Sequence, residues 1–506
     1  MAWLREMVQG GGPGGAAGTH AHATVDEAAW TQAGERLAAG EGTLLSLWGD
    51  AGAVAMAVLE GDTVAVLTLP CPTGRFPSIA RLHPPAIRLE RTIRDLYGLQ
   101  PLISPDARRW LDHGRWGVRQ PLGKAESGPD LGEAYAFRQA EGPPMHQIPV
   151  GPVHASIIEP GHFRFTANGE TVVRLEERLG YVHKGIDGLM AGAGIEHGAR
   201  LAGRVSGDST VAYSSAFARA VEAALGMVVP TRAVWLRALM AELERIANHL
   251  GDIGAICNDA SFSLMHAHCG ILREQVLRAS DTCFGHRLMM DRVVPGGVAV
   301  DLAGEGEAAL HDLIGAIERR FPELVELYEN TASLQNRTVT TGTLSAALAQ
   351  QYGAGGYVGR ASGRAFDARK APGYAPYGSL SFDVAVRSEG DVDARVWVRI
   401  EEVHQSVSLL GQILERLPSG ELQAATPQAP PGGGEGLALV EGFRGDVLAW
   451  VRLAPDGPGL RIARCHLRDP SWFQWPLLEA AIEGNIVADF PLCNKSFNCS
   501  YSGHDL

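Results

Sequence analysis

The segment 394–418, ARVWVRIEEVHQSVSLLGQILERLP, constrains the fold more than any other stretch of this chain. Its apolar residues recur every three or four positions, which is the spacing of one face of an α-helix. These residues form a near-heptad seam of Val396, Ile400, Val403, Val407, Leu410, Leu414 and Leu417. Pro418 and Gly420 then end the pattern. A long helix with one apolar face predicts a central helix of a bundle.

A second helix of this kind is predicted over residues 232–250. Its apolar stripe consists of Leu236, Leu239, Leu243, Ile246 and Leu250. Glu242, Glu244 and Arg245 lie off this stripe. We expect these three charges on a solvated face or between helices.

The rest of the chain divides into regions of different character. Residues 1–24 are rich in Gly and Ala and are expected to be a disordered tail. Residues 25–125 predict a small α/β domain, with strands at 42–50, 52–60 and 63–70 and a helix from Pro84 to Gly98. Residues 126–150 read as a linker. Residues 151–506 predict a mostly helical bundle domain with a small C-terminal β region at 437–441, 446–454 and 460–467. The fold class is therefore α+β.

Composition narrows the choice of partners. The 506 residues include 44 Lys and Arg against 57 Asp and Glu, a net charge of −13. This acidic balance argues against nonspecific nucleic-acid binding, which needs a basic surface. No apolar run is long enough to span a bilayer, and the N-terminal segment has no signal-peptide pattern. We expect a cytoplasmic protein. The seven cysteines are scattered and form no C-x-x-C pair.

Six motifs occur in an order that matches one known family. They are GPVHASIIEPGHFRF (151–165), GYVHKGID (180–187), RVSGDST (204–210), ELERIANHLGDIG (242–254), GRASGRAFDARK (359–370) and SFNCSYSGHDL (496–506). Together they resemble the large subunit of energy-converting nickel–iron hydrogenases of formate-hydrogenlyase type. They are also similar to the related quinone-site core subunit of respiratory complex I. The stretch RFPSIARLHPPAIRLERTIRDLYG (75–98) resembles the accessory complex I subunit, fused in front.

The resemblance locates a metal site whose ligands are absent here. Hydrogenase members of the family bind nickel and iron through two C-x-x-C pairs. Ser206, Ser209, Ser500 and Gly503 stand at the four ligand positions of this sequence. A serine hydroxyl stays protonated near neutral pH and is a hard, weak donor, whereas the cluster needs soft thiolates. We therefore expect no nickel–iron centre and no bound metal.

The resemblance also assigns roles around this pocket. Glu159 matches the family glutamate that relays protons. The alternative is that its carboxylate caps a helix or a turn. His154 and His162 flank Glu159 in the sequence, and each is either a member of a proton path or an ordinary core histidine. The resemblance places His183 beside the same cavity. Arg360, Asp367 and Arg369 suggest an interface network near a partner's iron–sulfur cluster, or an ordinary surface charge cluster.

The markers of a quinone site are not kept. The family's quinone-binding tyrosine falls at Gly207, and Tyr213 is the residue of this chain that we expect could take its place. The family's headgroup histidine falls at Ile158, and His154 is the residue that could take its place. These changes leave open whether the pocket takes a quinone or another electron acceptor. No Gly-rich dinucleotide fingerprint follows a predicted strand, so any oxidation of NADH would belong to a partner.

Three functions follow from these observations. The first is a redox-active core subunit of a hetero-oligomeric, membrane-associated complex of the hydrogenase or NADH dehydrogenase kind. It would pair with an iron–sulfur small subunit and with antiporter-like membrane subunits, on the inner face of the cell membrane. The second is an active nickel–iron hydrogenase, which the ligand positions argue against. The third is a structural subunit without chemistry of its own.

Overall fold

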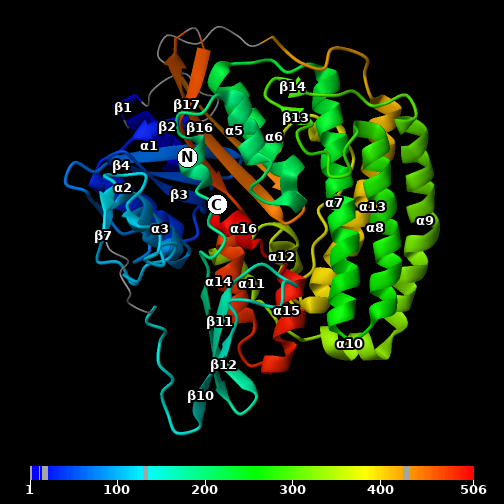
Figure 1. The fold of residues 1–506 in the computed structure, drawn as a ribbon, viewed down its shortest axis with the longest axis horizontal. Helices are drawn as coiled ribbons and strands as arrows, with labels where there is room; N and C mark the ends of the chain where they lie inside the picture. The colour runs from blue at the N-terminus through cyan, green and yellow to red at the C-terminus, as the bar shows by residue number, and fades with distance from the viewer. Residues whose placement is uncertain (1–2, 11, 14–20, 129–134, 426–432, 458) are drawn as a thin grey trace.

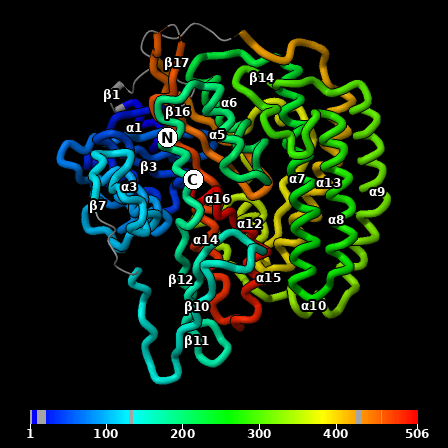
Figure 2. The backbone as a smooth tube through the Cα atoms, in the orientation of Figure 1, coloured from blue at the N-terminus to red at the C-terminus, as the bar shows by residue number. Residues whose placement is uncertain are grey.

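The computed structural model describes residues 3–10, 12–13, 21–128, 135–425, 433–457 and 459–506. In Figure 1 a mixed sheet lies on the left, a bundle of long helices lies on the right, and the C-terminal strands run between them. Figure 2 shows the C-terminal helices, in red, near the middle of the molecule. The long helices gather in the bundle, and most strands belong to the N-terminal sheet, a three-stranded ribbon and the C-terminal sheet, which confirms the predicted α+β class. No helix of the described residues is both long enough and apolar enough to cross a membrane.

The N-terminal sheet has the strand order β1-β2-β5-β4-β3. Its strands are β1 (Gly12–Pro13), β2 (Ala21–Thr24), β3 (Thr43–Asp50), β4 (Ala53–Glu60) and β5 (Thr63–Pro70). The helices of this region are α1 (Trp3–Gly10), α2 (Glu27–Ala38) and α3 (Ile87–Tyr97). The three predicted strands and the helix that ends at Gly98 are confirmed. Gly98 has a φ of 73°, a left-handed conformation that suits glycine at a helix C-terminus.

The predicted disordered tail over residues 1–24 is wrong for the parts that the structure describes. Residues 3–10 form α1, and Leu4 is fully buried. The backbone amides of Trp3 and Leu4 donate to the Glu60 carboxylate at 3.2 and 2.9 Å. Ala21–Thr24 pair in parallel with β5. Burial of the large apolar side chains of Trp3 and Leu4 thus orders this segment, although the sequence near it is rich in glycine. Residues 1–2, 11 and 14–20 of that prediction lie outside the described residues.

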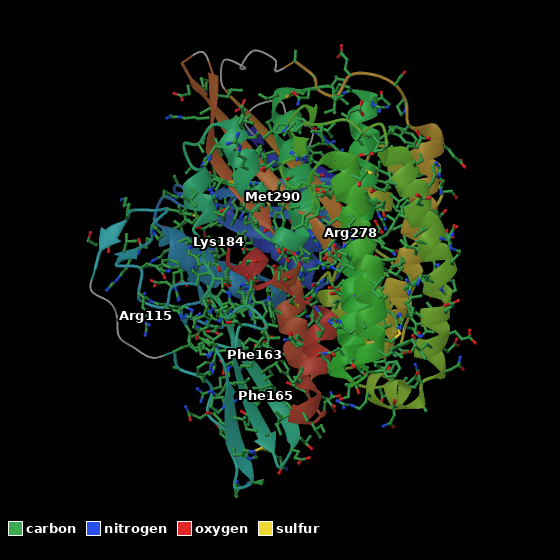
Figure 3. The ribbon with its side chains drawn as sticks, turned by 45° about the vertical axis from the view of Figure 1, so that its right-hand side comes forward. Arg115, Phe163, Phe165, Lys184, Arg278 and Met290 are labelled. Carbon is green, nitrogen blue, oxygen red and sulfur yellow. The ribbon has the colours of Figure 1, made fainter. Side chains whose placement is uncertain are left out.

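A three-stranded antiparallel ribbon connects the two main parts of the chain. It consists of β10 (Met145–Val150), β11 (His162–Asn168) and β12 (Thr171–Arg178). Residues 145–150, which we placed in the linker 126–150, therefore belong to a sheet; residues 129–134 of that linker lie outside the described residues. Phe163 and Phe165 of the ribbon pack with their ring centroids 4.8 and 5.0 Å from that of Phe490 (Figure 3).

The bundle is built from α6 (Thr210–Leu225), α7 (Thr231–Asp259), α8 (Ser263–Phe284), α9 (Gly306–Asn330) and α13 (Val392–Arg416). Shorter helices beside it are α4 (Ile186–Met190), α5 (Ile195–Ala202), α10 (Ala332–Thr338), α11 (Ala346–Gln351) and α12 (Gly356–Ala361). The predicted helices correspond to α7 and α13, and their apolar residues share one buried cluster. Glu242, Glu244 and Arg245 are also buried, so these charges lie between helices and not on a solvated face.

The C-terminal region adds β15 (Gly434–Gly442), β16 (Gly445–Asp456) and β17 (Gly459–Arg468) as an antiparallel sheet. Three helices follow: α14 (Ser471–Ala481), α15 (Phe490–Phe497) and α16 (Tyr501–Asp505). One face of this sheet packs on α6, and the other packs on β3 and β4 through a cluster that includes Trp48 and Trp450. The N-terminal region therefore shares its core with the C-terminal sheet.

The remaining strands form short pairs. They are β6 (Arg75–Pro77) with β7 (Gln100–Leu102), β8 (Val118–Arg119) with β9 (Glu126–Ser127), and β13 (Val293–Val294) with β14 (Gly297–Val298).

Candidate functional site

The segment RVSGDST turns sharply before α6. Ser206 has an extended backbone, and a short 3₁₀ turn, Gly207–Ser209, follows it. The Ser206 side chain does not cap this turn, because its hydroxyl donates to Asp208 Oδ1 at 2.6 Å. The turn thus directs Ser206 and Asp208 toward the C-terminal segment.

The two halves of the predicted ligand set meet in space although 294 positions separate them. Ser206 Oγ lies 3.1 Å from Ser500 Oγ. The Ser500 hydroxyl also accepts a hydrogen bond from the Gly503 amide at 2.9 Å, which caps α16. Gly503 lies close to Asp469: a Cβ built at this position would be 2.4 Å from Asp469 Oδ2. The structure therefore brings these positions together, and position 503 has no room for a larger side chain without movement of Asp469.

Arg444, which the sequence reasoning missed, occupies the centre of this site. It lies in the turn between β15 and β16 and is buried. Its guanidinium donates to Asp208 Oδ1 at 3.0 Å, to Ser209 Oγ at 3.1 Å and to the backbone oxygen of Asn498. More than two hundred residues separate Arg444 from Asp208, so no local pattern could have indicated the contact.

The charge of Arg444 controls the ionisation of Asp208. Burial by itself would raise the pKa of this carboxyl, but the charge of Arg444 and the hydrogen bonds from Arg444 and Ser206 outweigh burial. The pKa of Asp208 is therefore held well below its usual range. Asp208 stays ionised at neutral pH and forms a stable ion pair with the arginine.

An open pocket of about 570 Å³ lies over these residues. Its polar lining comes from Ser206, Asp208, Arg444, Lys495 and Ser500, together with the loop 153–160. Lys495 Nζ lies 3.3 Å from Asp252 Oδ1, so a second cation is fixed beside Arg444. Val153 and Ile157 of the loop are 73% and 84% exposed. The pocket thus combines hydroxyls, two cations and the Asp208 carboxylate on its inside with apolar side chains at its mouth.

The predicted proton-path residues are only partly brought together. Glu159 and His154 line this pocket, but Glu159 is exposed and accepts only a long hydrogen bond from the Ser502 amide, at 3.2 Å. His154 Nε2 contacts the Gly161 backbone oxygen at 2.7 Å. His162 does not line the pocket; it lies on β11 with Nδ1 3.3 Å from the Gly151 oxygen. Burial lowers the pKa of His162, which therefore has the character of a core histidine.

The network of Arg360, Asp367 and Arg369 lies in the interior and not on an interface. All three residues are at most 3% exposed. Arg360 donates to Glu402 at 2.9 Å and to Glu441 at 2.8 Å. Arg369 donates to Asp367 at 2.6 Å and to Glu242 at 3.1 Å. This network joins α7, α13 and β15, so it connects the bundle to the C-terminal sheet.

Three further candidates lie apart from the pocket. Tyr213 is fully buried, and its hydroxyl donates to Asp469 at 2.6 Å, so it is not available to a quinone. Gly207 is exposed and does not line the pocket. His183 also does not line it; its Nδ1 lies 2.7 Å from the Asp505 backbone oxygen, and its ring stacks on Trp116.

Comparison with known proteins identifies the family. Residues 49–130 match the family described as "Respiratory-chain NADH dehydrogenase, 30 Kd subunit", and residues 261–432 match the corresponding "49 Kd subunit". Formate hydrogenlyase subunit 5 of Escherichia coli is 31% identical over 440 residues, which cover 85% of this chain and 77% of that protein. The chain belongs to this family. It joins a 30 kDa-type segment to a 49 kDa-type, hydrogenase-like large subunit in one polypeptide.

Further relatives come from both branches of the family. The carbon monoxide-induced hydrogenase of Rhodospirillum rubrum is 33% identical over 358 residues, covering 70% of this chain and 97% of that protein. A subunit of the NADH-quinone oxidoreductase of Roseiflexus is 34% identical over 359 residues, covering 68% of this chain and 94% of that protein. Among solved structures, a chain of an archaeal membrane-bound sulfane sulfur reductase complex matches with a TM-score of 0.67 and 26% identity, over 72% of this chain and 98% of that one.

Proposed function

We propose that this chain is the core subunit of a membrane-associated oxidoreductase complex, and that its pocket binds an organic electron acceptor where hydrogenases bind nickel and iron. The observation that carries this proposal is the content of the pocket floor. Two serine hydroxyls are in contact there, and the buried guanidinium of Arg444 lies beside them.

The residues at the ligand positions do not fit a nickel–iron centre. Three of the four positions offer neutral hydroxyls, and Gly503 offers no side-chain donor at all. Such a centre needs soft, negatively charged thiolates. We infer that this chain is not itself a hydrogenase.

The pocket is suited to an acceptor that has polar oxygens and an apolar tail, and a quinone is our first candidate. Arg444 and Lys495 can donate hydrogen bonds to its carbonyl oxygens and stabilise negative charge as the ring is reduced. Val153 and Ile157 offer apolar contacts at the mouth. Reduction to the quinol takes two electrons and two protons. In this proposal the electrons come from an iron–sulfur partner subunit, and the exposed Glu159 and the half-buried His154 pass protons from solvent.

The relatives support an assembly of several subunits. By their names they are subunits of formate hydrogenlyase and of NADH-quinone oxidoreductase, and the structural neighbour belongs to a respiratory membrane complex. We infer that this chain pairs with an iron–sulfur small subunit and, through it, with antiporter-like membrane subunits. It would sit peripherally on the inner face of the cell membrane, and any oxidation of NADH would take place in a partner.

Metal analysis and quinone reduction by the purified complex test the proposal together. We expect much less than one nickel per complex. We also expect Lys495→Met to lower the quinone reductase rate about tenfold or more, because it removes a cation that faces the acceptor. Lys124→Met, at an exposed position outside the pocket, is the matched control and should leave the rate unchanged. One nickel per complex would overturn the proposal. Equal rates in the two variants would favour a purely structural subunit.

A further inference from the structure

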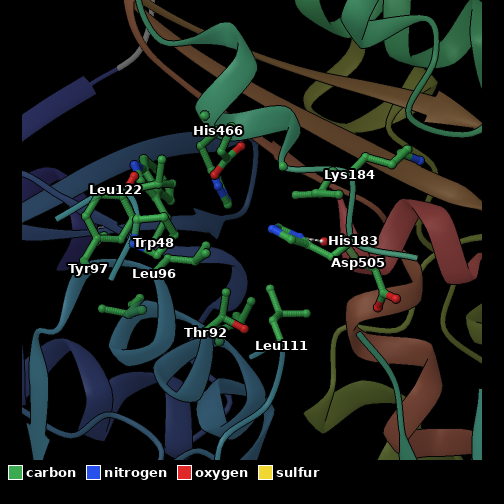
Figure 4. A pocket seen from close by; sticks show the side chains of 18 of the residues that line it. Trp48, Thr92, Leu96, Tyr97, Leu111, Leu122, His183, Lys184, His466 and Asp505 are labelled. Atoms are coloured by element: carbon green, nitrogen blue, oxygen red, sulfur yellow. Dashed lines mark hydrogen bonds between the residues drawn. The ribbon is translucent and has the colours of Figure 1, made fainter. Parts of the chain in front are cut away.

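A second pocket, of about 300 Å³, lies between the N-terminal region and the C-terminal segment. It shares no lining residue with the candidate site. Figure 4 shows Trp48, Tyr97 and Leu122 on one side of it, with His183 and Asp505 across from them. The volume is at the lower end of the range typical of small-molecule sites.

Aromatic rings form much of the wall of this pocket. Trp48, Tyr97, Trp116 and Trp472 all line it. The Trp48 ring stacks on His466 with centroids 4.7 Å apart, and the Trp116 ring stacks on His183 at the same separation. These stacking contacts fix the rings in place. A rigid wall of flat rings favours a flat, aromatic occupant.

Four residues of this wall carry buried polar atoms that have no hydrogen-bond partner among the described residues. The atoms are Trp48 Nε1, Tyr97 Oη, Asp187 Oδ1 and Arg464 Nε. All four residues are at least nine-tenths buried. Unpaired buried polar groups are rare in folded proteins, because each costs the free energy of its lost hydration. Four of them around one cavity indicate that something polar completes the site.

The arrangement of these atoms specifies the chemistry of the occupant. Arg464 Nη2 and Asp187 Oδ2 form an ion pair at 3.0 Å, which leaves Arg464 Nε as a free donor and Asp187 Oδ1 as a free acceptor. A hydroxyl can accept from the first and donate to the second. A carboxylate has no proton to donate and is repelled by Asp187, whereas an ammonium cannot accept from Arg464. A neutral hydroxyl on a flat ring satisfies both conditions.

We propose that this pocket is a binding site for a small hydroxylated aromatic molecule of one or two rings. Its ring would lie among the Trp48, Tyr97 and Trp116 side chains, and its hydroxyl would bond to Arg464 and Asp187. The same hydroxyl oxygen has a second lone pair, which can accept a hydrogen bond from Trp48 Nε1 or from Tyr97 Oη. The proposal is independent of the acceptor pocket, because the two pockets have separate linings.

Titration calorimetry of the full-length chain with 2-naphthol and with naphthalene tests the site. The two probes have the same rings, and only the first carries a hydroxyl. We expect 2-naphthol to bind at least fivefold more tightly than naphthalene. Loss of the donor that reaches this oxygen, in Tyr97→Phe or in Trp48→Phe, should weaken binding of 2-naphthol about threefold to tenfold, the range of one hydrogen bond, with little effect on naphthalene.

Trp450→Phe is the matched control. Trp450 Nε1 is also buried and unpartnered, and its ring lies 5.4 Å from that of Trp48, but Trp450 does not line the pocket. Its substitution should leave both affinities unchanged. Thr92→Trp should fill the pocket and abolish binding of both probes, and Leu122→Trp serves if the first variant does not fold. The proposal is overturned if neither probe binds, which would mean that water alone satisfies the four atoms, or if all variants bind both probes equally.

Discussion

Replacement of Arg444 by methionine gives the sharpest test of how the candidate pocket is held open. The variant keeps much of the apolar stem of the side chain and removes the guanidinium. It thereby removes the ion pair with Asp208 and the hydrogen bonds to Ser209 and to the Asn498 backbone. Loss of one partner of a buried pair typically costs about 3–5 kcal/mol. The Asp208 side chain is 35% exposed, so solvent screens part of this loss and we expect about 2–3 kcal/mol.

The pH dependence of this loss has a definite sign. In the wild type, the pKa of Asp208 is lowered in the folded state, because Arg444 outweighs the effect of burial. The ionised carboxylate therefore stabilises the fold above its unfolded pKa of about 3.9, and this contribution disappears as the pH falls through the folded pKa. Without Arg444, the largest influence that lowers the pKa of Asp208 is gone, and burial acts against the ionised form. The stability gap between the two proteins should therefore widen as the pH rises from about 3 through the unfolded pKa of about 3.9.

Urea unfolding followed by circular dichroism measures this gap. Arg204→Met is the matched control, because Arg204 pairs with Asp291 on the surface and should contribute less than about 1 kcal/mol. The double variant Arg444→Met/Asp208→Asn removes the stranded charge and should recover about 1 kcal/mol or more of the loss. If Arg444→Met costs no more than Arg204→Met, or if the double variant recovers nothing, then this ion pair does not hold the pocket.

Three further predictions concern the surroundings of the site. In Ser206→Cys/Ser500→Cys the two sulfurs should approach closely enough to form a disulfide under mild oxidation, seen as loss of both free thiols in a labelling assay; two reactive thiols would contradict the 3.1 Å contact. Arg360→Met should lower the free energy of unfolding by about 3–5 kcal/mol, since it removes the cation paired with the buried Glu441 and one of the partners of Glu402, and a loss under 1 kcal/mol in urea unfolding would refute this. Burial raises the pKa of Glu244 to about 8, so the wild type should lose up to about 1.4 kcal/mol of stability per pH unit between its unfolded pKa and pH 8. Glu244→Gln should be free of this loss, and parallel stability–pH profiles for the two proteins would contradict it.

Regular periodicity was the most reliable guide to the fold. The stripes of α7 and α13 follow from residue spacing alone, because a helix with one apolar face must bury that face. The strands β3, β4 and β5 were equally predictable from their short apolar runs and the turns between them. The same rules failed at α1, where a short apolar pair within Gly-rich surroundings packs on a sheet that forms from later residues.

Buried charges were the features that spacing could not predict. Arg360 and Glu242 look like surface residues in the sequence. Only the packing of α7, α13 and β15 shows that both are buried, where Arg360 pairs with Glu441 and Glu242 pairs with Arg369. The motif order correctly indicated that Ser206 and Ser500 share one pocket. It gave no indication of Arg444, because a side chain from a β-turn reaches this pocket only through the tertiary fold.

The contacts around Arg444 explain how the pocket can keep its shape without a metal. In our proposal this chain has neither the four thiolates nor the metals that they bind. The segment with Ser206 and Ser209 and the segment with Ser500 and Gly503, which a metal would join, therefore need another connection. Arg444 supplies it, since the guanidinium binds Asp208 and Ser209 of the first segment and the Asn498 backbone of the second. Asn498 Nδ2 in turn donates to Asp252 Oδ1 of α7 at 2.9 Å. The cation that holds the two segments together is therefore part of the protein, and the space above it stays open to an organic ligand.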